Sequence, residues 1–137
     1  GIPVVQLNTD GACHIEAMSI KNILPQFDLD DLDLIIIENI GNLVCPAEFD
    51  IGESLKVALL SIPEGDDKVE KYPLMFTRAD ALVLTKYDLI NYFEFNEERV
   101  DKNALIRNDE LKLFKVNSKN EDDIKEFKNW LISKIEE

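Results

Sequence analysis

Two cysteines and one histidine are the side chains best suited to bind a transition metal. Cys13 and His14 are adjacent, and Cys45 follows in a later segment. Two thiolates and an imidazole suit Zn²⁺ or Ni²⁺ rather than Mg²⁺ or Ca²⁺. Three ligands leave a tetrahedral site open to water or a partner chain, which fits a transferable metal. The alternative is that Cys45 is a small buried hydrophobe and His14 a polar residue at the start of a helix.

A second group of residues could recognise a guanine base. Thr85-Lys86-Tyr87-Asp88 directly follows an apolar run. A carboxylate at this place can accept two N–H bonds from guanine, whereas adenine lacks that pair of donors and is penalised. The lysine stem can pack over the base. The alternative is that Asp88 caps the following helix and Lys86 is a solvated strand end.

Two further residue pairs would complete a nucleotide site. Ser118 and Lys119 end a later strand, and their backbone N–H groups could meet the same base from its other side. Glu38 and Gly41 resemble an acid-x-x-Gly switch, in which the acid holds a magnesium-bound water and the glycine approaches a terminal phosphate. An ordinary strand followed by a glycine turn would give the same pattern.

Five strands are predicted, and most of them end shortly before these residues. The central one, Leu34–Ile37, is a short β-branched apolar run, typical of a strand buried on both faces of a parallel sheet. In parallel sheets ligands bind beyond the carboxyl ends of the strands, so the loops at Cys13 and Cys45 should meet at one edge. The other strands are expected at Val4–Leu7, Leu55–Ile62, Ala79–Leu84 and Leu111–Val116.

Helices between these strands complete the pattern. They are predicted over Ile15–Leu24, Leu89–Phe95, Glu97–Ile106 after an Asn96 cap, and Asp122–Ile135. The last is amphipathic, and one face carries Ile124, Phe127, Trp130, Leu131 and Ile135. Alternating strands and helices predict an α/β fold with a mainly parallel sheet, and the length suits one domain over residues 1–137.

Composition narrows the partners and the compartment. The 137 residues carry a net charge of −13, which disfavours nucleic acid and anionic membrane surfaces. No long apolar segment or signal peptide is visible, so a soluble cytoplasmic protein is expected. Two cysteines are too few for a disulfide scaffold. The chain begins with Gly1 rather than Met and enters a strand almost at once, which suggests a cut through a larger protein.

Several stretches together resemble the hydrogenase nickel-incorporation GTPases, the HypB family. The run Glu-Asn-x-Gly-Asn-Leu-x-Cys-Pro, which begins at Glu38, is specific to that family rather than to GTPases in general. The resemblance spans nearly the whole chain. It is carried by Gly1–Thr9, Cys13–Ala17, Ile37–Ala47, Phe49–Glu53, Glu64–Lys68, Tyr72-Pro73 and Thr85–Leu89.

The resemblance implies a P-loop GTPase-type fold that supports nickel delivery to [NiFe] hydrogenase precursors. By position, Cys13, His14 and Cys45 match the metal ligands, Lys86 and Asp88 the guanine motif, and Glu38 and Gly41 the switch. The implied cofactors are GTP or GDP, Mg²⁺, and Ni²⁺ or Zn²⁺. The implied partners are a second copy with metal at the interface, a nickel donor or acceptor accessory protein, and the hydrogenase large-subunit precursor.

Three departures from the family pattern qualify these expectations. The phosphate-binding loop Gly-x-x-x-x-Gly-Lys-Ser/Thr is absent and is expected before Gly1, so this C-terminal portion of the G domain should bind triphosphate poorly and hardly hydrolyse it. Thr85 replaces the usual Asn, which bears on the strength of guanine recognition. Met18 stands where a histidine is common, which leaves His14 as the sole imidazole.

Three other interpretations fit the same residues. The chain could be a non-catalytic metal-binding or interaction fragment that acts through the two thiols and the imidazole, or a relative of the urease-type nickel GTPases. It could also be an unrelated acidic α/β domain with structural cysteines. Failure to bind Ni²⁺ or Zn²⁺ would contradict both metal-binding hypotheses.

Overall fold

The computed structural model describes residues 1–136, which form two compact units. The first unit comprises residues 1–54, and the second begins at Leu55. The single domain expected over residues 1–137 stays a prediction beside these two units. None of the helices among residues 1–136 combines the length and apolar character that crossing a membrane requires.

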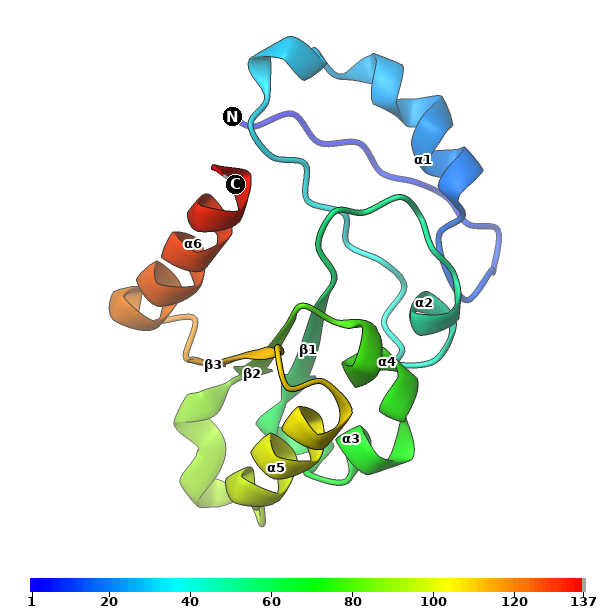
Figure 1. Cartoon of the computed structure of the whole chain (residues 1–137). Coiled ribbons are helices and arrows are strands. Elements are labelled where there is room, and N and C mark those ends of the chain that lie inside the picture. The colour runs from blue at the N-terminus through cyan, green and yellow to red at the C-terminus, as the bar shows by residue number, and fades with distance from the viewer. Residues whose placement is uncertain (137) are drawn as a thin grey trace. The chain divides into compact units, whose positions relative to one another are not determined.

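A three-stranded parallel sheet organises the second unit (Figure 1). Its strands are β1 (Val57–Ser61), β2 (Ala81–Thr85) and β3 (Lys112–Val116), in the spatial order β1-β2-β3. Ser61 pairs with Thr85, which in turn pairs with Val116, so the three strands end level. The predicted strands near residues 55, 79 and 111 are therefore confirmed, and the loops that follow them leave the same edge of the sheet.

Helices flank both faces of this sheet. The helix α6 (Glu121–Ile135) lies on one side, and α3 (Lys68–Lys71), α4 (Pro73–Arg78) and α5 (Glu97–Arg107) lie on the other (Figure 1). Two 3₁₀ segments follow strands: η3 (Ile62–Glu64) after β1 and η4 (Tyr87–Tyr92) after β2. The helix predicted over Leu89–Phe95 is wrong, because the chain forms the tighter η4, which begins earlier, at Tyr87, with only Lys86 between it and the end of β2.

Alternating residues of the strands build two apolar layers. On the α6 side, Val83 and Phe114 pack with Phe127 and Trp130 of the helix. Part of the predicted amphipathic face of α6 is thereby confirmed, although Ile124 and Ile135 each remain 43% exposed. On the opposite face, fully buried residues of the strands and helices form the core; they include Leu60, Leu82, Leu84, Val69, Phe76 and Val100.

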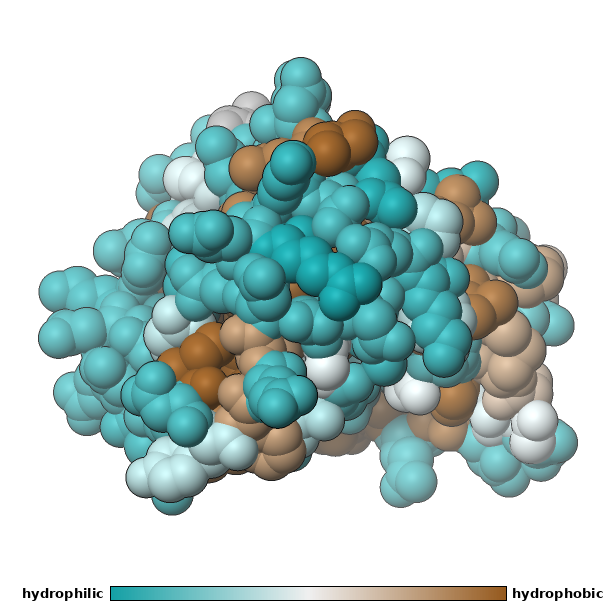
Figure 2. Space-filling view, turned by 90° about the horizontal axis from the view of Figure 1, so that it is seen from below, coloured by the Kyte–Doolittle hydropathy of each residue, from teal (hydrophilic) through white to brown (hydrophobic). Residues whose placement is uncertain are grey.

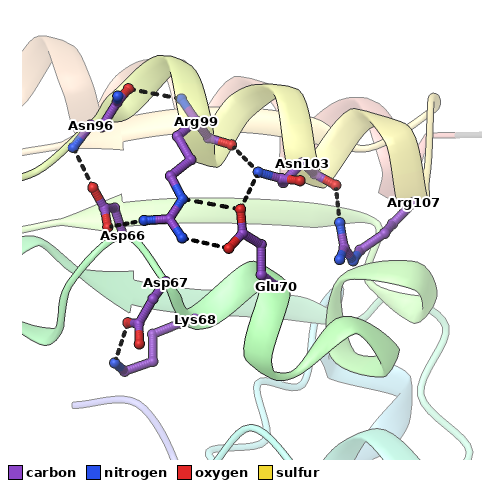
Figure 3. A network of polar contacts seen from close by, with 8 residues as sticks. All are labelled: Asp66, Asp67, Lys68, Glu70, Asn96, Arg99, Asn103 and Arg107. Atoms are coloured by element: carbon purple, nitrogen blue, oxygen red, sulfur yellow. Dashed lines mark hydrogen bonds and ion pairs between the residues drawn. The ribbon is translucent and has the colours of Figure 1, made fainter.

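A polar network ties α5 to α3 and to the loop before it (Figure 3). The predicted cap is confirmed, because the Asn96 side chain accepts a hydrogen bond from the backbone of Arg99 at 3.0 Å. The Arg99 guanidinium donates to both carboxylate oxygens of Glu70, at 3.0 and 2.5 Å, and to Asp66 at 3.0 Å. The paired bonds to Glu70 have the bidentate geometry that arginine favours. They hold the pKa of Glu70 below its ordinary value.

Short helical turns and extended segments make up the first unit. Its elements are α1 (Ala17–Ile23), η1 (Leu24–Gln26), η2 (Leu29–Asp31) and α2 (Cys45–Glu48). Ile15, Ile20 and Ile51 form its buried cluster, against which Leu7, Leu24 and Ile37 pack. The helix predicted over residues 15–24 is thus confirmed in α1 and η1.

The predicted strands at Val4–Leu7 and Leu34–Ile37 are wrong for this structure. Neither segment pairs with a strand among the described residues. Leu34, Ile35 and Ile36 are exposed by 43%, 38% and 80%, so the expected burial on both faces is absent as well. An apolar β-branched run favours a strand only where a neighbouring strand supplies the ladder of hydrogen bonds, and here it has none.

The surface is mostly hydrophilic. Hydrophilic residues cover most of the face in Figure 2, and smaller hydrophobic patches lie between them. Apolar side chains exposed by 60% or more include Leu59 on β1 and Tyr92 at the end of η4.

Candidate metal centre

Cys13, His14 and Cys45 come together in the first unit. One ligand atom of each lies within 4.8 Å of the others. The Sγ atom of Cys13 is 3.5 Å from Nδ1 of His14, and Cys13 is exposed while the other two residues are half-buried. Both cysteines are free thiols. Such a cluster at the surface can bind a soft or borderline metal and leave a coordination position open.

Asn42 joins the two segments that carry the cysteines. Its side-chain N–H donates to the Cys13 carbonyl at 2.8 Å. Its side-chain oxygen accepts from the backbone N–H of Val44 at 3.0 Å and of Cys45 at 2.9 Å. Asn39 makes a parallel connection, since its oxygen accepts from the backbone N–H of Ile15 at 2.9 Å.

The predicted meeting of Cys13 with Cys45 is therefore correct, but the predicted cause is wrong. No parallel strands precede these loops among the described residues, and asparagine side chains bridge the segments instead. The sequence reasoning missed Asn42. The sequence did hold a signal for Asn42: its side-chain amide can both donate and accept hydrogen bonds, and it stands three positions before the candidate ligand Cys45.

Phe49 was also missed as a residue of this centre. Its ring stacks on the imidazole of His14, with centroids 3.9 Å apart and planes inclined by 2°. Phe49 follows α2, which begins at Cys45. The stacking fixes the plane of the imidazole and thereby limits the directions in which its nitrogens can point.

The protonation of Cys45 depends on its neighbour. The hydrogen bond with the Cys13 thiol raises the pKa of Cys45, and desolvation and the nearby Cys13 and Glu48 act in the same direction. Cys45 thus favours the neutral thiol, and a metal that bound its thiolate would have to displace the proton.

The candidate guanine-binding residues lie in the second unit, at the level edge of the sheet. Thr85 is the last residue of β2, and Lys86 adopts a left-handed backbone conformation with φ of 53°. Asp88 falls in the first turn of η4, whose N-cap position is held by Lys86, so Asp88 does not occupy the cap position of its alternative role. The Lys86 stem and the Asp88 carboxylate are thus free of a capping function.

Ser118 and Lys119 lie in the turn that follows β3. The side chain of Asn117 accepts the backbone N–H of Lys119 at 3.0 Å and so shapes this turn. Because Thr85 pairs with Val116, the turn and the loop after β2 begin on neighbouring strands. The structure brings together the starting points of the two segments that were predicted to contact one base.

A polar cluster lies between β3, α5 and the loop after β2. Tyr87 donates a hydrogen bond to Glu97, and Lys115 forms a short ion pair with the same carboxylate. Burial alone would raise the pKa of Glu97, but the hydrogen bonds from Lys115 and Tyr87 outweigh it, and the pKa is lowered. The loop that carries Lys86 and Asp88 is thereby anchored to the first turn of α5.

Glu38 and Gly41 lie in the irregular segment before α2, in the first unit. Both are exposed. A Cβ atom added to Gly41 would meet no other heavy atom within 4 Å, so the space beside the glycine is open. The same segment carries Asn39 and Asn42, which hold the cysteine-bearing segments.

Comparisons with known proteins place this chain among nucleotide-binding proteins. Residues 1–115 match the family model described as CobW/HypB/UreG, nucleotide-binding domain. The hydrogenase maturation factor HypB of Escherichia coli is 42% identical over 131 residues, which cover 96% of this chain and 45% of that protein. A hydrogenase/urease maturation factor HypB of Helicobacter pylori is 40% identical and covers 100% of this chain and 58% of its own length.

Solved structures of similar proteins share the fold. HypB from Helicobacter pylori in complex with nickel superposes with a TM-score of 0.91 at 39% identity, over 96% of this chain and 63% of that one. HypB from Archaeoglobus fulgidus gives a TM-score of 0.85 at 36% identity, over 92% and 67%. The predicted P-loop GTPase-type α/β fold is confirmed for the part of these proteins that the chain covers. The chain spans about half the length of the relatives that it matches in sequence.

Proposed function

This chain belongs to the CobW/HypB/UreG family of nucleotide-binding domains, and from that premise we propose that it is part of a GTP-dependent nickel chaperone for the maturation of [NiFe] hydrogenase. The observation that carries the proposal is the meeting of Cys13, His14 and Cys45 within 4.8 Å. In this proposal the metal is cargo that is bound and released, and GTP hydrolysis by the whole protein is coupled to its transfer.

Nickel or zinc suits the three candidate ligands. Two thiols and an imidazole provide soft and borderline donors, whereas Mg²⁺ prefers oxygen ligands. The open position would be filled by water or by a second copy of the chain, so we propose a homodimer with metal at its interface. An accessory protein that donates or accepts nickel and the hydrogenase large-subunit precursor are the proposed partners. Free thiols at Cys13 and Cys45 suit the reducing cytoplasm.

The guanine base is proposed to bind at the edge of the second unit's sheet. Asp88 would accept the two N–H donors of the base, and the Lys86 stem would cover its plane. Thr85 and the turn at Ser118 and Lys119 would border it. The register of β2 with β3 supports this arrangement, because both segments leave neighbouring strands.

The phosphates and Mg²⁺ are proposed to bind near Glu38 and Gly41. Glu38 would hold a water of the magnesium ion, and the backbone N–H of Gly41 would contact the terminal phosphate. The open space beside Gly41 supports that contact. Magnesium, when bound, supplies charge neutralisation for phosphoryl transfer, and the residues of this chain orient the water and the phosphate.

A second candidate function is non-catalytic metal binding. A further alternative is delivery of nickel to urease as well as to hydrogenase. One observation favours metal binding alone. All three candidate ligands lie within residues 1–54, a unit that contains none of the candidate guanine-binding residues. The Helicobacter pylori relative is named a hydrogenase/urease maturation factor, which makes urease a proposed alternative recipient.

An anaerobic Ni²⁺ titration tests the metal function. The reduced chain should show saturable thiolate-to-nickel absorption that is lost in Cys45→Ala. His14→Ala should retain part of the absorption, because both thiolates remain. Equal titration curves for the wild type and Cys45→Ala would overturn the proposal.

A base-exchange experiment tests the guanine site. Asp88→Asn replaces an acceptor by an amide donor, which suits the C2 carbonyl of xanthine better than the amino group of guanine. The variant should bind GDP at least tenfold more weakly and gain affinity for xanthosine diphosphate. Unchanged GDP binding would contradict the role of Asp88. Asp109→Asn, which changes an exposed acid before β3, is the matched control.

A further inference from the structure

Asn42 contacts both segments that carry the cysteines, and its hydrogen bonds span the candidate metal centre. The amide nitrogen donates to the Cys13 carbonyl at 2.8 Å, and the amide oxygen accepts from the Cys45 backbone N–H at 2.9 Å. We propose that Asn42 is the positioning residue of this centre, setting the separation of the two thiols before any metal arrives. Only the expected effect of Asn42 on nickel binding rests on the proposed metal function; its effect on the separation of the thiols does not.

The chemistry of this position requires an amide. Asparagine offers two N–H donors and one carbonyl acceptor on a short, stiff side chain, so it can bond a carbonyl on one segment and N–H groups on another. The N–H groups of Val44 and Cys45 lie at the start of α2, whose own cap residue makes no side-chain bond. Asn42 satisfies these donors, which otherwise lack an intrahelical partner.

The thiols have little freedom to correct an error in the backbone. A cysteine sulfur is one bond from Cβ, and a metal–sulfur distance is held near 2.3 Å with a tolerance of about 0.2 Å. A shift of the Cys13 segment by about an ångström would therefore remove one ligand from the metal. Residues that orient ligands in this way typically change metal affinity by about 10- to 100-fold when they are replaced.

Two substitutions separate the two halves of the bridge. Asn42→Ala removes the donor and the acceptor together. Asn42→Asp keeps an oxygen for the N–H groups of Val44 and Cys45 but has no N–H for the Cys13 carbonyl. Asn42→Asp should therefore release the Cys13 segment alone. Asn8→Ala is the control, because the Asn8 side chain bonds only the nearby backbone N–H of Asp10 among the contacts described.

A metal-free measurement tests the position of the thiols directly. Cys13 and Cys45 are the two cysteines of the chain, so an intramolecular bridge reports their separation. Dibromobimane, which becomes fluorescent when it bridges two neighbouring thiols, should react rapidly with the wild type and Asn8→Ala. Both Asn42 variants should form the bridge at least tenfold more slowly while each thiol still reacts with a monofunctional reagent. Equal bridging rates would overturn the inference, whatever the chain does with nickel.

A nickel titration then tests the consequence for the metal. Asn42→Ala and Asn42→Asp should bind Ni²⁺ about 10- to 100-fold more weakly than the wild type. The thiolate-to-nickel absorption of Asn42→Asp should fall as it does in Cys13→Ala, because the Cys13 thiolate leaves the metal in the first variant and is absent from the second. One outcome would overturn the inference about Asn42 and leave the nickel function standing: both Asn42 variants bind nickel as tightly as the wild type, and Cys45→Ala does not bind it. The opposite outcome would support the inference and overturn the nickel function: the Asn42 variants form the thiol bridge slowly, but the wild type and Cys45→Ala give equal nickel titration curves.

Discussion

The hydroxyl of Tyr87 donates a 2.5 Å hydrogen bond to the carboxylate of Glu97, and so a residue of the candidate base-binding loop is fastened to the first turn of α5. Lys115 of β3 pairs with the same carboxylate. The hydrogen bond from Tyr87 to the Glu97 carboxylate also raises the pKa of Tyr87, and burial acts in the same direction. The conformation of the loop after β2 thus depends on a helix ten residues further along the chain.

Tyr87→Phe removes this bond and keeps the ring. Because the lost bond goes to a charged acceptor in a half-buried place, we expect the free energy of unfolding to fall by about 1 kcal/mol. Urea unfolding measures the change. Tyr92→Phe is the control, since Tyr92 is 81% exposed, and it should stay within about 0.5 kcal/mol of the wild type. Equal losses in the two variants would contradict the role of the Glu97 contact.

Asp101→Asn should stabilise the protein at neutral pH. Burial raises the pKa of Asp101 despite Lys115 at 3.7 Å, and one carboxylate oxygen is buried without a hydrogen-bond partner. A raised pKa means that the folded state holds the proton more tightly, so the wild type loses stability as the pH rises from the unfolded pKa through the folded one. Asp101→Asn lacks this loss, so its free energy of unfolding should exceed that of the wild type. The gain should be less than about 1 kcal/mol, because the variant also loses the ion pair with Lys115.

Unfolding measured from pH 3 to pH 7 checks this sign. The stability difference between Asp101→Asn and the wild type should grow as the pH rises through the raised pKa and then stay constant. A difference that shrinks with rising pH would show that the attraction of Lys115 outweighs the burial of Asp101.

Phe114→Ala should be the most damaging of these changes. Phe114 is 8% exposed and lies 5.3 Å from the ring of Phe127 and 5.5 Å from that of Trp130. Removing the ring leaves a cavity between β3 and α6, and we expect a loss of about 3 kcal/mol. Trp130, the single tryptophan of the chain, provides the fluorescence signal. Leu59→Ala, at a side chain 60% exposed, should lose far less.

Nickel affinity should rise with pH. The pKa of Cys45 is raised, chiefly by its hydrogen bond with the Cys13 thiol, so binding as a thiolate must release a proton. The apparent affinity should therefore increase up to about tenfold per pH unit for each proton released, below the pKa of the thiol. Titrations at pH 6.5, 7.5 and 8.5 measure this slope. An affinity that is independent of pH would mean that the metal is bound without the thiolate of Cys45.

The second unit was largely predictable from the sequence. Its strands are short apolar runs that find partners within the unit, and Asn96 caps α5 through the side chain that its residue type suggested. The apolar run Leu34–Ile37 is predicted as a strand but forms none, because composition alone cannot say whether a neighbouring strand is present to pair with it. The sequence predicted that Cys13 and Cys45 meet, and their role as metal ligands stays a prediction. The cause of the meeting was not predictable, because the side-chain bonds of Asn39 and Asn42 depend on the fold and leave no period in the sequence.

The order of the sheet has a consequence for how the second unit forms during synthesis. Each strand pairs with the strand that precedes it in the chain, so β2 meets a β1 that has already emerged, and β3 meets β2. Among these three strands of residues 1–136, none must wait for a later segment to insert between two existing neighbours. Each crossover therefore closes a shorter loop than pairing with a more distant strand would, and the sheet can grow in the direction of translation. A ribosome-bound chain that ends shortly after β2 should already protect the backbone amides of that strand from hydrogen exchange.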